Sequence, residues 1–183
     1  MRVLAGALKG RRLVTPRGST TRPTADQVRI ALMDTLMPRL PDARLLDLFA
    51  GAGGVGLEAL SRGAAHATFV ERDPRALDAL VENIRILDLE PRTHVARGDV
   101  VRQLARLAGQ DRRFEIVFLD PPYATDDAER ALAALGAGTL IAPEGLVIAQ
   151  HLTKRRLPEF GCLRAFRDRR FGETSLTFFR AEE

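Results

Sequence analysis

A short apolar run in this sequence ends in a carboxylate, two prolines and an aromatic ring. The run EIVFL covers residues 115–119, and DPPY continues it to Tyr123, the single tyrosine of the chain. Because prolines fix φ and donate no backbone N–H, Pro121 and Pro122 should end a strand and make the next turn rigid. The Asp120 carboxylate and the Pro121 carbonyl could then accept both N–H hydrogens of an exocyclic amine on a nucleobase, with Tyr123 stacked on the base. This pattern predicts attack by a base nitrogen on an electrophile.

A glycine loop upstream offers a place for that electrophile. In LLDLFAGAGGVGLEAL, which begins at Leu45, Gly51, Gly53 and Gly56 fit the pattern G-x-G-x-x-G, and Glu71 ends the next apolar run. The pattern allows a dinucleotide site, because glycines let a backbone approach a ligand and a helix N-terminus favours anionic groups. The glycines alone also fit a tight turn that binds nothing.

An acid inside the first strand favours a different cofactor. Asp47 lies four residues before Gly51, where its carboxylate would repel a pyrophosphate but attract the ammonium and sulfonium groups of S-adenosylmethionine. Asp47, Glu71, Asp99 and Asp120 end four successive strands, and ligands of open α/β sheets bind outside such carboxyl ends. We expect Glu71 to accept hydrogen bonds from both ribose hydroxyls, Asp99 to accept from the adenine amine, and Asp120 to serve the chemistry. Each acid alone could instead cap a helix.

The expected site residues form two groups. The residues expected to bind S-adenosylmethionine are Asp47, Phe49, Gly51, Gly53, Glu71, Arg72, Asp99 and Val100. The residues expected to be catalytic are Asp120, Pro121, Pro122 and Tyr123. The three histidines are scattered without metal-ligand spacing, so no metal is expected.

The elements that must position these residues alternate from about residue 42 onward. Apolar β-type runs alternate with helix-like segments as far as GLVIAQH, which predicts an α/β fold with a mainly parallel sheet. Two further β-like runs, CLRAF and TSLTFFR, should form an antiparallel hairpin, because RDRRFGE between them is too short and polar for a helix. The prediction is a Rossmann-like class I methyltransferase fold with seven strands.

The start of the chain differs from the rest. Residues 1–23 are rich in Gly, Arg and turn formers, and they are predicted to be a basic extension on a methyltransferase domain of residues 24–183. Within the extension, residues 3–5 could pair with residues 11–14 in a small β-hairpin. Thr24 is expected to cap the helix that follows.

The composition indicates one domain. A chain of 183 residues, 45% of them hydrophobic, is long enough to bury a substantial core. Its single cysteine cannot form an internal disulfide, and the sequence has neither a signal-peptide pattern nor a long apolar run. We expect a soluble cytoplasmic protein with no membrane partner.

The net charge of +4 is unevenly distributed along the sequence. Residues 1–29 carry seven basic side chains and one acidic side chain, and residues 153–170 carry seven and two. Residues 30–152 hold thirteen basic and eighteen acidic side chains. If the two basic segments come together in the fold, they would form a patch able to hold a polyanion.

Several segments together resemble the RsmD-type methyltransferases of bacteria. The likeness covers nearly the whole chain: GALKGRRL, TRPTADQVR, LLDLFAGAGGVGLEALSRGA, FVERD, LDPPY and FGETSLTFF. The central segments are shared with many methyltransferases, whereas the GRRL and RPT elements are much narrower. Two positions depart from the family pattern: Ile30, where glutamate is usual, and Ala52, where serine is common.

The resemblance implies methylation of the N2 amine of a guanine in small-subunit (16S) ribosomal RNA. It implies S-adenosylmethionine as the methyl donor and a substrate within an assembled or assembling 30S particle. We also expect the enzyme to be a monomer. It also gives the basic segments a use in gripping RNA around an unstacked guanine. The implied RNA-binding residues are Arg11, Arg12, Arg22, Lys154, Arg155 and Arg156.

Three other functions fit parts of the pattern. An amino methyltransferase that acts on adenine N6 or cytosine N4 of DNA or another RNA would use the same clamp. The glycine fingerprint also allows an NAD-dependent dehydrogenase, and a non-catalytic RNA-binding protein would keep only the basic segments. The shortness of the chain favours a substrate whose own folded shape supplies specificity.

Overall fold

Helices and strands alternate along the described part of the chain, residues 1–16, 23–110 and 112–182 of this computed structural model. The helices are α1 (Pro23–Leu36), α2 (Gly54–Ser61), α3 (Pro74–Ile86), α4 (Val100–Ala108) and α5 (Asp127–Gly136). The strands are β1 (Arg44–Leu48), β2 (His66–Glu71), β3 (Thr93–Arg97), β4 (Phe114–Leu119), β5 (Ile141–Leu152), β6 (Leu163–Phe171) and β7 (Thr174–Ala181). Single 3-10 turns cover Met37–Arg39 and Glu90–Arg92.

The strands form one twisted sheet in the order β3-β2-β1-β4-β5-β7-β6. The first five strands in this order are parallel, and β7 runs antiparallel to both β5 and β6. The predicted mainly parallel, seven-stranded sheet with a C-terminal antiparallel hairpin is therefore confirmed. Strand order reverses between β1 and β4, and in open α/β sheets ligands bind at such a switch point.

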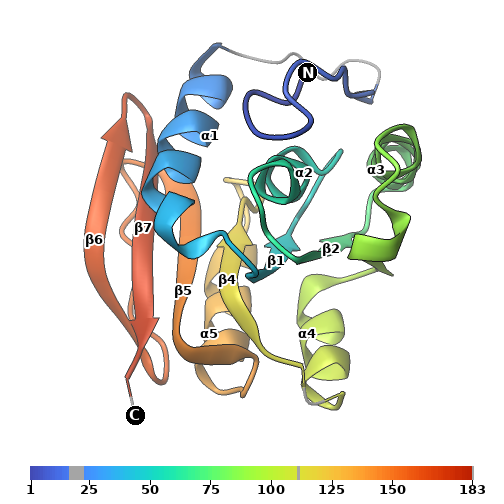
Figure 1. Ribbon diagram of the computed structural model, residues 1–183. Helices are drawn as coiled ribbons and strands as arrows, with labels where there is room; N and C mark the ends of the chain where they lie inside the picture. Colours follow the sequence, from blue (N-terminus) through green and yellow to red (C-terminus); the bar gives the residue numbers. More distant parts are fainter. Residues whose placement is uncertain (17–22, 111, 183) are drawn as a thin grey trace.

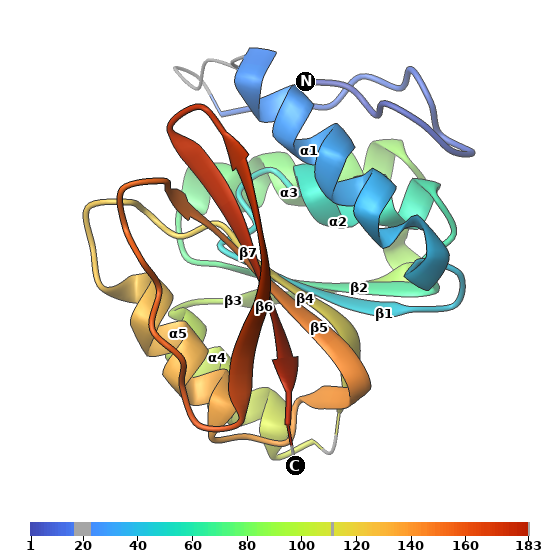
Figure 2. The same cartoon turned by 90° about the vertical axis from the view of Figure 1, so that its left-hand side faces the viewer.

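Two apolar cores cover the two faces of this sheet. Side chains that alternate along a strand point to opposite faces, so Leu45 and Leu46 of β1 enter different cores. One core packs against α1, α2 and α3, and the other packs against α4 and α5 (Figures 1 and 2). Because both faces are covered, the central strands are mostly apolar, with Asp47 and Thr68 as buried polar exceptions. Phe69 of β2 is fully buried in the first of these cores, so Phe69→Ala would lower the free energy of unfolding by about 3–5 kcal/mol.

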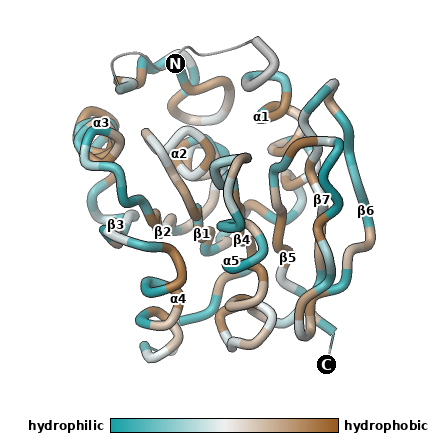
Figure 3. Tube along the Cα trace, turned by 180° about the vertical axis from the view of Figure 1, so that it is seen from behind, coloured by the Kyte–Doolittle hydropathy of each residue, from teal (hydrophilic) through white to brown (hydrophobic). Residues whose placement is uncertain are grey.

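The outer strand β6 is longer than the sequence suggested. The segment RDRRF was expected to belong to the turn of the hairpin, but β6 continues to Phe171 and the turn is only Gly172 and Glu173. Figure 3 shows the hydrophilic character of much of β6 at the edge of the sheet. Arginine suits an edge strand because its charge stays in water while its stem packs. The Arg169 guanidinium lies 5.3 Å from the Phe171 ring centroid.

The N-terminal segment folds back on itself and docks on α2. Arg2 and Arg12 form an antiparallel bridge, and the Val3 N–H donates to the Arg11 carbonyl at 3.0 Å. The pairing therefore begins about two residues earlier than predicted on the first side of the hairpin. The backbone N–H groups of Leu4 and Ala5 donate to the buried carboxylate of Glu58 at 2.8 and 2.9 Å.

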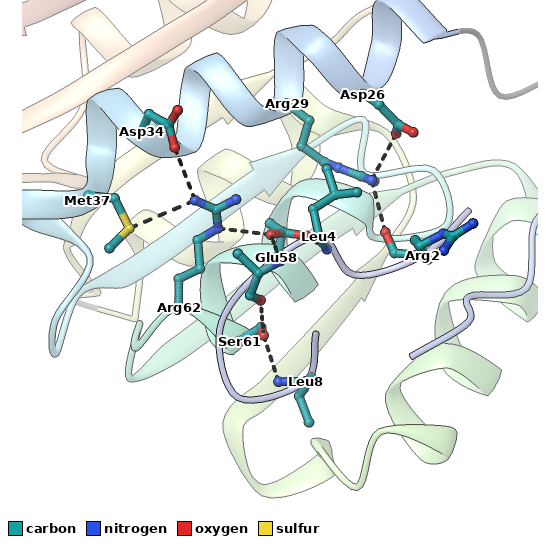
Figure 4. A network of polar contacts seen from close by, with 11 residues as sticks. Arg2, Leu4, Leu8, Asp26, Arg29, Asp34, Met37, Glu58, Ser61 and Arg62 are labelled. Carbon is teal, nitrogen blue, oxygen red and sulfur yellow. Dashed lines mark hydrogen bonds and ion pairs between the residues drawn. The ribbon is translucent and has the colours of Figure 1, made fainter. Parts of the chain in front are cut away.

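A close backbone approach fixes this docking. Gly6 has a φ of +82°, and a Cβ at this position would lie 1.9 Å from the Ser61 carbonyl oxygen. The Ser61 hydroxyl accepts from the Leu8 N–H at 2.9 Å and donates to the Ala5 carbonyl (Figure 4). Only glycine fits this contact without displacement of the segment.

Helix α1 lies across the sheet beside the N-terminal segment. The helix begins at Pro23, so Thr24 lies within its first turn. The prediction that Thr24 is the N-cap is therefore wrong. Val28, Leu32 and Leu36, spaced four residues apart, are buried along one face of the helix. Within the described residues, none of the helices has the length and apolarity needed to cross a membrane.

Candidate active site

The carboxyl ends of β1 and β4 meet at the switch point of the sheet. Asp47 pairs in register with Phe118, and the Asp120 N–H donates to the Leu48 carbonyl at 3.3 Å. This register brings the DPPY turn next to the end of β1, which continues into the glycine loop. Two segments that are about seventy residues apart in the sequence therefore form one edge.

The glycine loop uses left-handed backbone conformations to turn from β1 into α2. Phe49 has a φ of +61°, Gly51 of +57° and Gly53 of +85°. Phe49 is not glycine, so its conformation costs about 1–3 kcal/mol, and such residues are concentrated at functional sites. A Cβ on Gly51 would meet no protein atom within 4 Å, so the space beside this glycine is open to a ligand.

Glu71 is held in place by the backbone. Its Oε2 accepts from the Gly51 N–H at 2.7 Å, and its Oε1 accepts from the N–H groups of Arg72 and Asp73 at 2.7 and 2.8 Å. A carboxylate has about four acceptor sites, so one site on Oε2 remains. In this arrangement Glu71 could accept from one ribose hydroxyl, whereas both hydroxyls would require the loss of a backbone contact. Asp73 caps α3, because its side chain accepts from two backbone N–H groups in the first turn of the helix.

Asp47 is buried, with 2% of its surface exposed. One carboxylate oxygen accepts from the Gly56 N–H at 2.9 Å. Burial raises the pKa of Asp47 to about 7, the Gly56 N–H opposes this shift, and repulsion from Asp120 and Glu71 adds to it. A Cβ on Gly56 would lie 2.3 Å from the Phe69 ring, so glycine is required for this hydrogen bond.

Asp120 and Tyr123 are joined by a residue that sequence reasoning missed. The Gln150 amide in β5 donates to Asp120 Oδ1 at 2.9 Å and to the Tyr123 hydroxyl at 3.0 Å. A polar residue at the end of the apolar run GLVIA was the available signal. Desolvation raises the pKa of Asp120 to about 7, and the Gln150 hydrogen bond opposes this shift. Because Asp120 keeps surface open to solvent, we expect the full shift only when a ligand covers it.

Two cavities meet at this edge of the sheet. One has a volume of about 520 Å³ and is lined by Phe49, Glu71, Arg72, Asp73, Asp120, Pro121, Pro122 and Tyr123. The other, of about 200 Å³, lies between α1 and the glycine loop, and Asp47, Phe49, Asp120 and Gln150 are among its lining residues. Phe49 and Asp120 line both cavities, so the acid of the DPPY turn faces both spaces.

Four expected cofactor residues, Gly51, Gly53, Asp99 and Val100, line neither cavity. The carboxylate of Asp99 accepts from the Arg102 N–H at 3.1 Å, which makes Asp99 the N-cap of α4. Val100 is buried in the first turn of the same helix. The capping alternative for Asp99 is therefore observed, and its other oxygen is the one left for an adenine amine.

The basic residues fall into different environments. Arg12, Lys154 and Arg156 are exposed, and Arg11 is exposed while one of its amino groups contacts the Ile86 carbonyl. Arg22 lies outside the described residues. Arg155 differs from its neighbours, because it forms an ion pair with Glu129 at 2.7 Å and donates to the Thr125 carbonyl at 2.7 Å and the Tyr123 carbonyl at 3.3 Å. Its guanidinium therefore supports the DPPY turn, a role that the RNA-binding prediction did not include.

Both basic segments border the cavities. Met1 lines the smaller cavity, and Arg155 contacts the turn that lines the larger one. The described residues contain no group of three or more His, Cys, Asp or Glu side chains that could hold a metal ion. The absence of a metal remains a prediction.

The donor set fits S-adenosylmethionine. A buried carboxylate at Asp47 suits a cationic group, Glu71 retains an acceptor site for a ribose hydroxyl, and open space lies beside Gly51. A pyrophosphate would instead meet Asp47, Glu71 and Asp120 as like charges. A parallel sheet with this loop and these acids at its switch point defines a Rossmann-like class I methyltransferase fold.

Comparisons with known proteins give the same class. The family model described as "Conserved hypothetical protein 95" matches residues 1–180. "Putative rRNA methyltransferase YlbH" of Bacillus subtilis is 36% identical over 181 residues, which are 98% of each chain. "Ribosomal RNA small subunit methyltransferase D" of Escherichia coli is 35% identical over 86% of this chain and 78% of its own. The solved structure of "Putative methyltransferase yhhF" from Escherichia coli superimposes with a TM-score of 0.88 at 32% identity, covering 100% of this chain and 98% of that one. The chain belongs to this family, that of the RsmD-type methyltransferases.

Proposed function

We propose that this protein methylates the exocyclic N2 amine of a specific guanine in small-subunit (16S) ribosomal RNA, with S-adenosylmethionine as the donor. The observation that carries this proposal is the position of Asp120, which lines the cavity of the DPPY turn and the cavity that contains Asp47. A single carboxylate thus borders both cavities, next to the donor residues Asp47 and Glu71 and to the acceptor residue Tyr123. The relationship to methyltransferases named for ribosomal RNA supplies the substrate class.

The donor side of the site binds a cationic nucleoside. When bound, S-adenosylmethionine supplies a methyl carbon made electrophilic by the positive sulfur. Glu71 accepts from the ribose, and the Asp47 carboxylate attracts the ammonium group. The glycine loop already has its binding conformation, so few groups of the protein need to become ordered when the donor binds. This preorganisation favours the donor orientation in which the methyl carbon faces the amine.

The acceptor side of the site holds the amine. An exocyclic amine is a poor nucleophile because its lone pair is delocalised into the ring. Asp120 and the Pro121 carbonyl accept its two hydrogens, which favours pyramidalisation and directs the lone pair toward the methyl carbon. Gln150 holds one Asp120 oxygen at 2.9 Å and leaves the other for the amine. The Tyr123 ring lies on the base, and such stacking contributes about 1–3 kcal/mol.

The reaction is a direct in-line displacement without a covalent enzyme intermediate. The amine nitrogen forms a bond to the methyl carbon while the carbon–sulfur bond breaks with its electron pair on sulfur. Positive charge appears on the nitrogen, where the Asp120 carboxylate stabilises it. The methylated nitrogen is acidic and loses its proton to Asp120 or to water.

The RNA lies across the basic segments that border the cavities. Arg11, Arg12, Lys154 and Arg156 contact phosphates, and the target guanine leaves its stack to reach Tyr123. An assembled or assembling 30S particle presents the guanine in a fixed setting to a monomeric, cytoplasmic enzyme. Its folded shape supplies the specificity that four phosphate contacts cannot supply.

The test is methylation of ribosomal subunits that lack this modification. The protein is incubated with tritium-labelled donor and either isolated small subunits or free 16S RNA, and the labelled base is identified by nuclease digestion and mass spectrometry. We expect N2-methylguanine at one site, with the particle as the better substrate. Label on adenine N6 or cytosine N4 would contradict the guanine assignment. Calorimetric binding of NAD in place of S-adenosylhomocysteine would contradict methyl transfer altogether.

A further inference from the structure

A β-bulge in the edge strand β6 leaves an aromatic ring exposed to solvent. The register of β6 against β7 shifts between Ala165 and Arg167, so Phe166 is the extra residue of the bulge. Phe166 has 45% of its surface exposed. A bulge bends the strand and re-aims a side chain, often close to a functional site. The strand itself therefore places this ring, which lines neither cavity of the active site.

Arginine side chains lie against the ring and its neighbour. The Arg180 guanidinium of β7 lies 4.2 Å from the centroid of the Phe166 ring, and the Arg167 guanidinium lies 5.8 Å from the centroid of the Phe178 ring. The two ring centroids are 6.4 Å apart. Phe178 is buried in the core that packs against α1, so these side chains share the face of the sheet that carries α1. We define the β6–β7 surface as Phe166, Arg167 and Arg180.

The two arginines of the β6–β7 surface have no ion-pair partner among the described residues. Both Arg167 and Arg180 are exposed. Arg164 on the same strand differs, because its guanidinium lies 3.7 Å from the carboxylates of both Glu159 and Glu182. The β6–β7 surface therefore offers two positive charges to an anionic partner.

Helix α1 separates the β6–β7 surface from the methyl-transfer site (Figure 2). Val28 and Leu32 of this helix line the smaller cavity. Arg169 of β6 donates to the Ala31 carbonyl at 3.0 Å and to the Thr35 hydroxyl at 2.8 Å, so the helix contacts the edge strand on its other side. Strand β6 also lies two strands from β5, which is roughly 10 Å at the usual strand spacing. A ligand on the β6–β7 surface would thus lie beside the methyl-transfer site and not within it.

The chemistry of the β6–β7 surface fits an unpaired nucleotide of RNA. The ring of Phe166 supports the Arg180 guanidinium from one side, which leaves the outer plane of the guanidinium for stacking on a base. Arg167 supplies a cation for a neighbouring phosphate. A peptide strand added to the sheet edge fits less well, because the bulge interrupts the pairing pattern and charged side chains oppose edge-to-edge pairing.

We propose that the β6–β7 surface binds a second segment of the ribosomal RNA substrate, with an unpaired base stacked on Arg180 and a phosphate held by Arg167. The proposal rests on the proposed function and adds an RNA contact from the C-terminal hairpin. Because α1 lies between the two sites, this segment is distinct from the one that carries the target guanine. Only a folded RNA presents both segments at once, and their joint binding raises affinity without any change in either site.

The test removes the stacking plane and keeps the charge. Arg180→Lys retains a cation without the planar group, and Arg170→Lys makes the same change at an exposed residue on the opposite face of β6. Affinity for isolated small subunits is measured across a salt series, together with single-turnover methyl transfer at saturating subunits. We expect Arg180→Lys to weaken binding at least about fivefold, with the salt slope and the saturated rate unchanged. Arg170→Lys should stay within about twofold of wild type.

Arg167→Gln tests the phosphate contact, and it should lower the slope of log affinity against log salt by about 0.7. Wild-type affinity in Arg180→Lys, or an equal loss in Arg170→Lys, would overturn the proposal. Photo-cross-linking of the variant Phe166→benzoylphenylalanine to small subunits identifies the partner directly. Attachment to 16S RNA agrees with the proposal, whereas attachment only to a ribosomal protein contradicts it.

The outcomes also separate this proposal from the proposed function. If the wild type methylates no RNA of the small subunit, the proposed function fails. If it methylates that RNA and the variants of the β6–β7 surface bind subunits as the wild type does, only the second RNA contact is wrong.

Discussion

The protonation state of the acids at the switch point depends on whether a cationic ligand is bound. Burial, with repulsion from Asp120 and Glu71, raises the pKa of Asp47 to about 7, so without a ligand Asp47 takes up a proton easily near neutral pH. Desolvation raises the pKa of Asp120 toward the same value when a ligand covers it. A bound cation reverses this tendency because it favours the ionised carboxylates. Binding of the donor and ionisation of these acids are therefore linked, and donor affinity should fall as the pH drops below about 7.

The raised pKa of Asp47 also predicts how stability depends on pH. The native state holds the proton more tightly than the unfolded chain, whose pKa is near 3.8. The associated stabilisation is complete below about pH 4 and is lost as the pH rises through about 7. We expect Asp47→Asn to be more stable relative to wild type at pH 8 than at pH 5, by on the order of 2–3 kcal/mol. Chemical denaturation of the ligand-free proteins measures this difference, and parallel pH profiles would contradict it.

Local patterns allowed the site residues of the loops and strand ends to be predicted. Asp47, Glu71 and the DPPY turn could be chosen because each follows a recognisable strand or glycine signal. Gln150 could not be found in that way, because its contacts with Asp120 and Tyr123 depend on the pairing of β4 with β5. The ion pair of Arg155 with Glu129 likewise depends on tertiary packing.

At the scale of elements, the N-terminal hairpin depends on one glycine contact with α2. Gly6 and Gly10 both have positive φ, +82° and +85°, so alanine at either costs about 1 kcal/mol or more in backbone strain. Only at Gly6 would the Cβ meet the Ser61 carbonyl, whereas nothing lies within 4 Å at Gly10. We expect Gly6→Ala to release the hairpin and Gly10→Ala to leave it docked. Limited proteolysis of the first sixteen residues distinguishes the two, and equal cleavage would count against this contact.

Adjacent arginines after β5 should behave differently. Arg155 pairs with Glu129 and holds the carbonyls of the DPPY turn, so Arg155→Ala should lower stability by about 1–2 kcal/mol and slow methyl transfer. Arg156 is exposed, so Arg156→Ala should leave stability unchanged and weaken RNA binding. Thermal denaturation and RNA titration of the two variants test this contrast. If Arg155→Ala weakened only RNA binding and Arg156→Ala lowered stability, the DPPY turn would not depend on Arg155.

The strand whose polar extent was mispredicted is the edge strand β6, whereas β5 begins four residues before the predicted run GLVIAQH. β6 carries arginines where an internal strand would be apolar, so its composition resembled a turn. The strands that are buried on both faces were easier to locate, because the sequence of each is an apolar run between helical segments. An edge strand lacks a continuous apolar run because one side of it is exposed to solvent.

At the scale of the whole molecule, each basic segment reaches the switch point with one residue, because Met1 lines the smaller cavity and Arg155 contacts the DPPY turn. We predict that reversing the charge of Arg11 and Arg12 together weakens RNA binding and flattens its dependence on salt concentration, because fewer counterions are released. Reversal of Arg112 and Arg113 is a matched control, since these exposed residues precede β4 at the opposite edge of the sheet. Equal effects of the two double variants across a salt series would show that the RNA does not follow the predicted surface.

The central claim is that Asp120 holds the acceptor amine beside the donor. Single-turnover methyl transfer to unmodified small subunits, measured for Asp120→Ala alongside calorimetry with S-adenosylhomocysteine, tests it most directly. The control Asp126→Ala removes an exposed acid that makes no capping hydrogen bond just before α5. We predict that Asp120→Ala slows transfer by at least about a hundredfold while cofactor affinity stays within severalfold, and that Asp126→Ala changes neither. Transfer by Asp120→Ala at the wild-type rate would contradict the account.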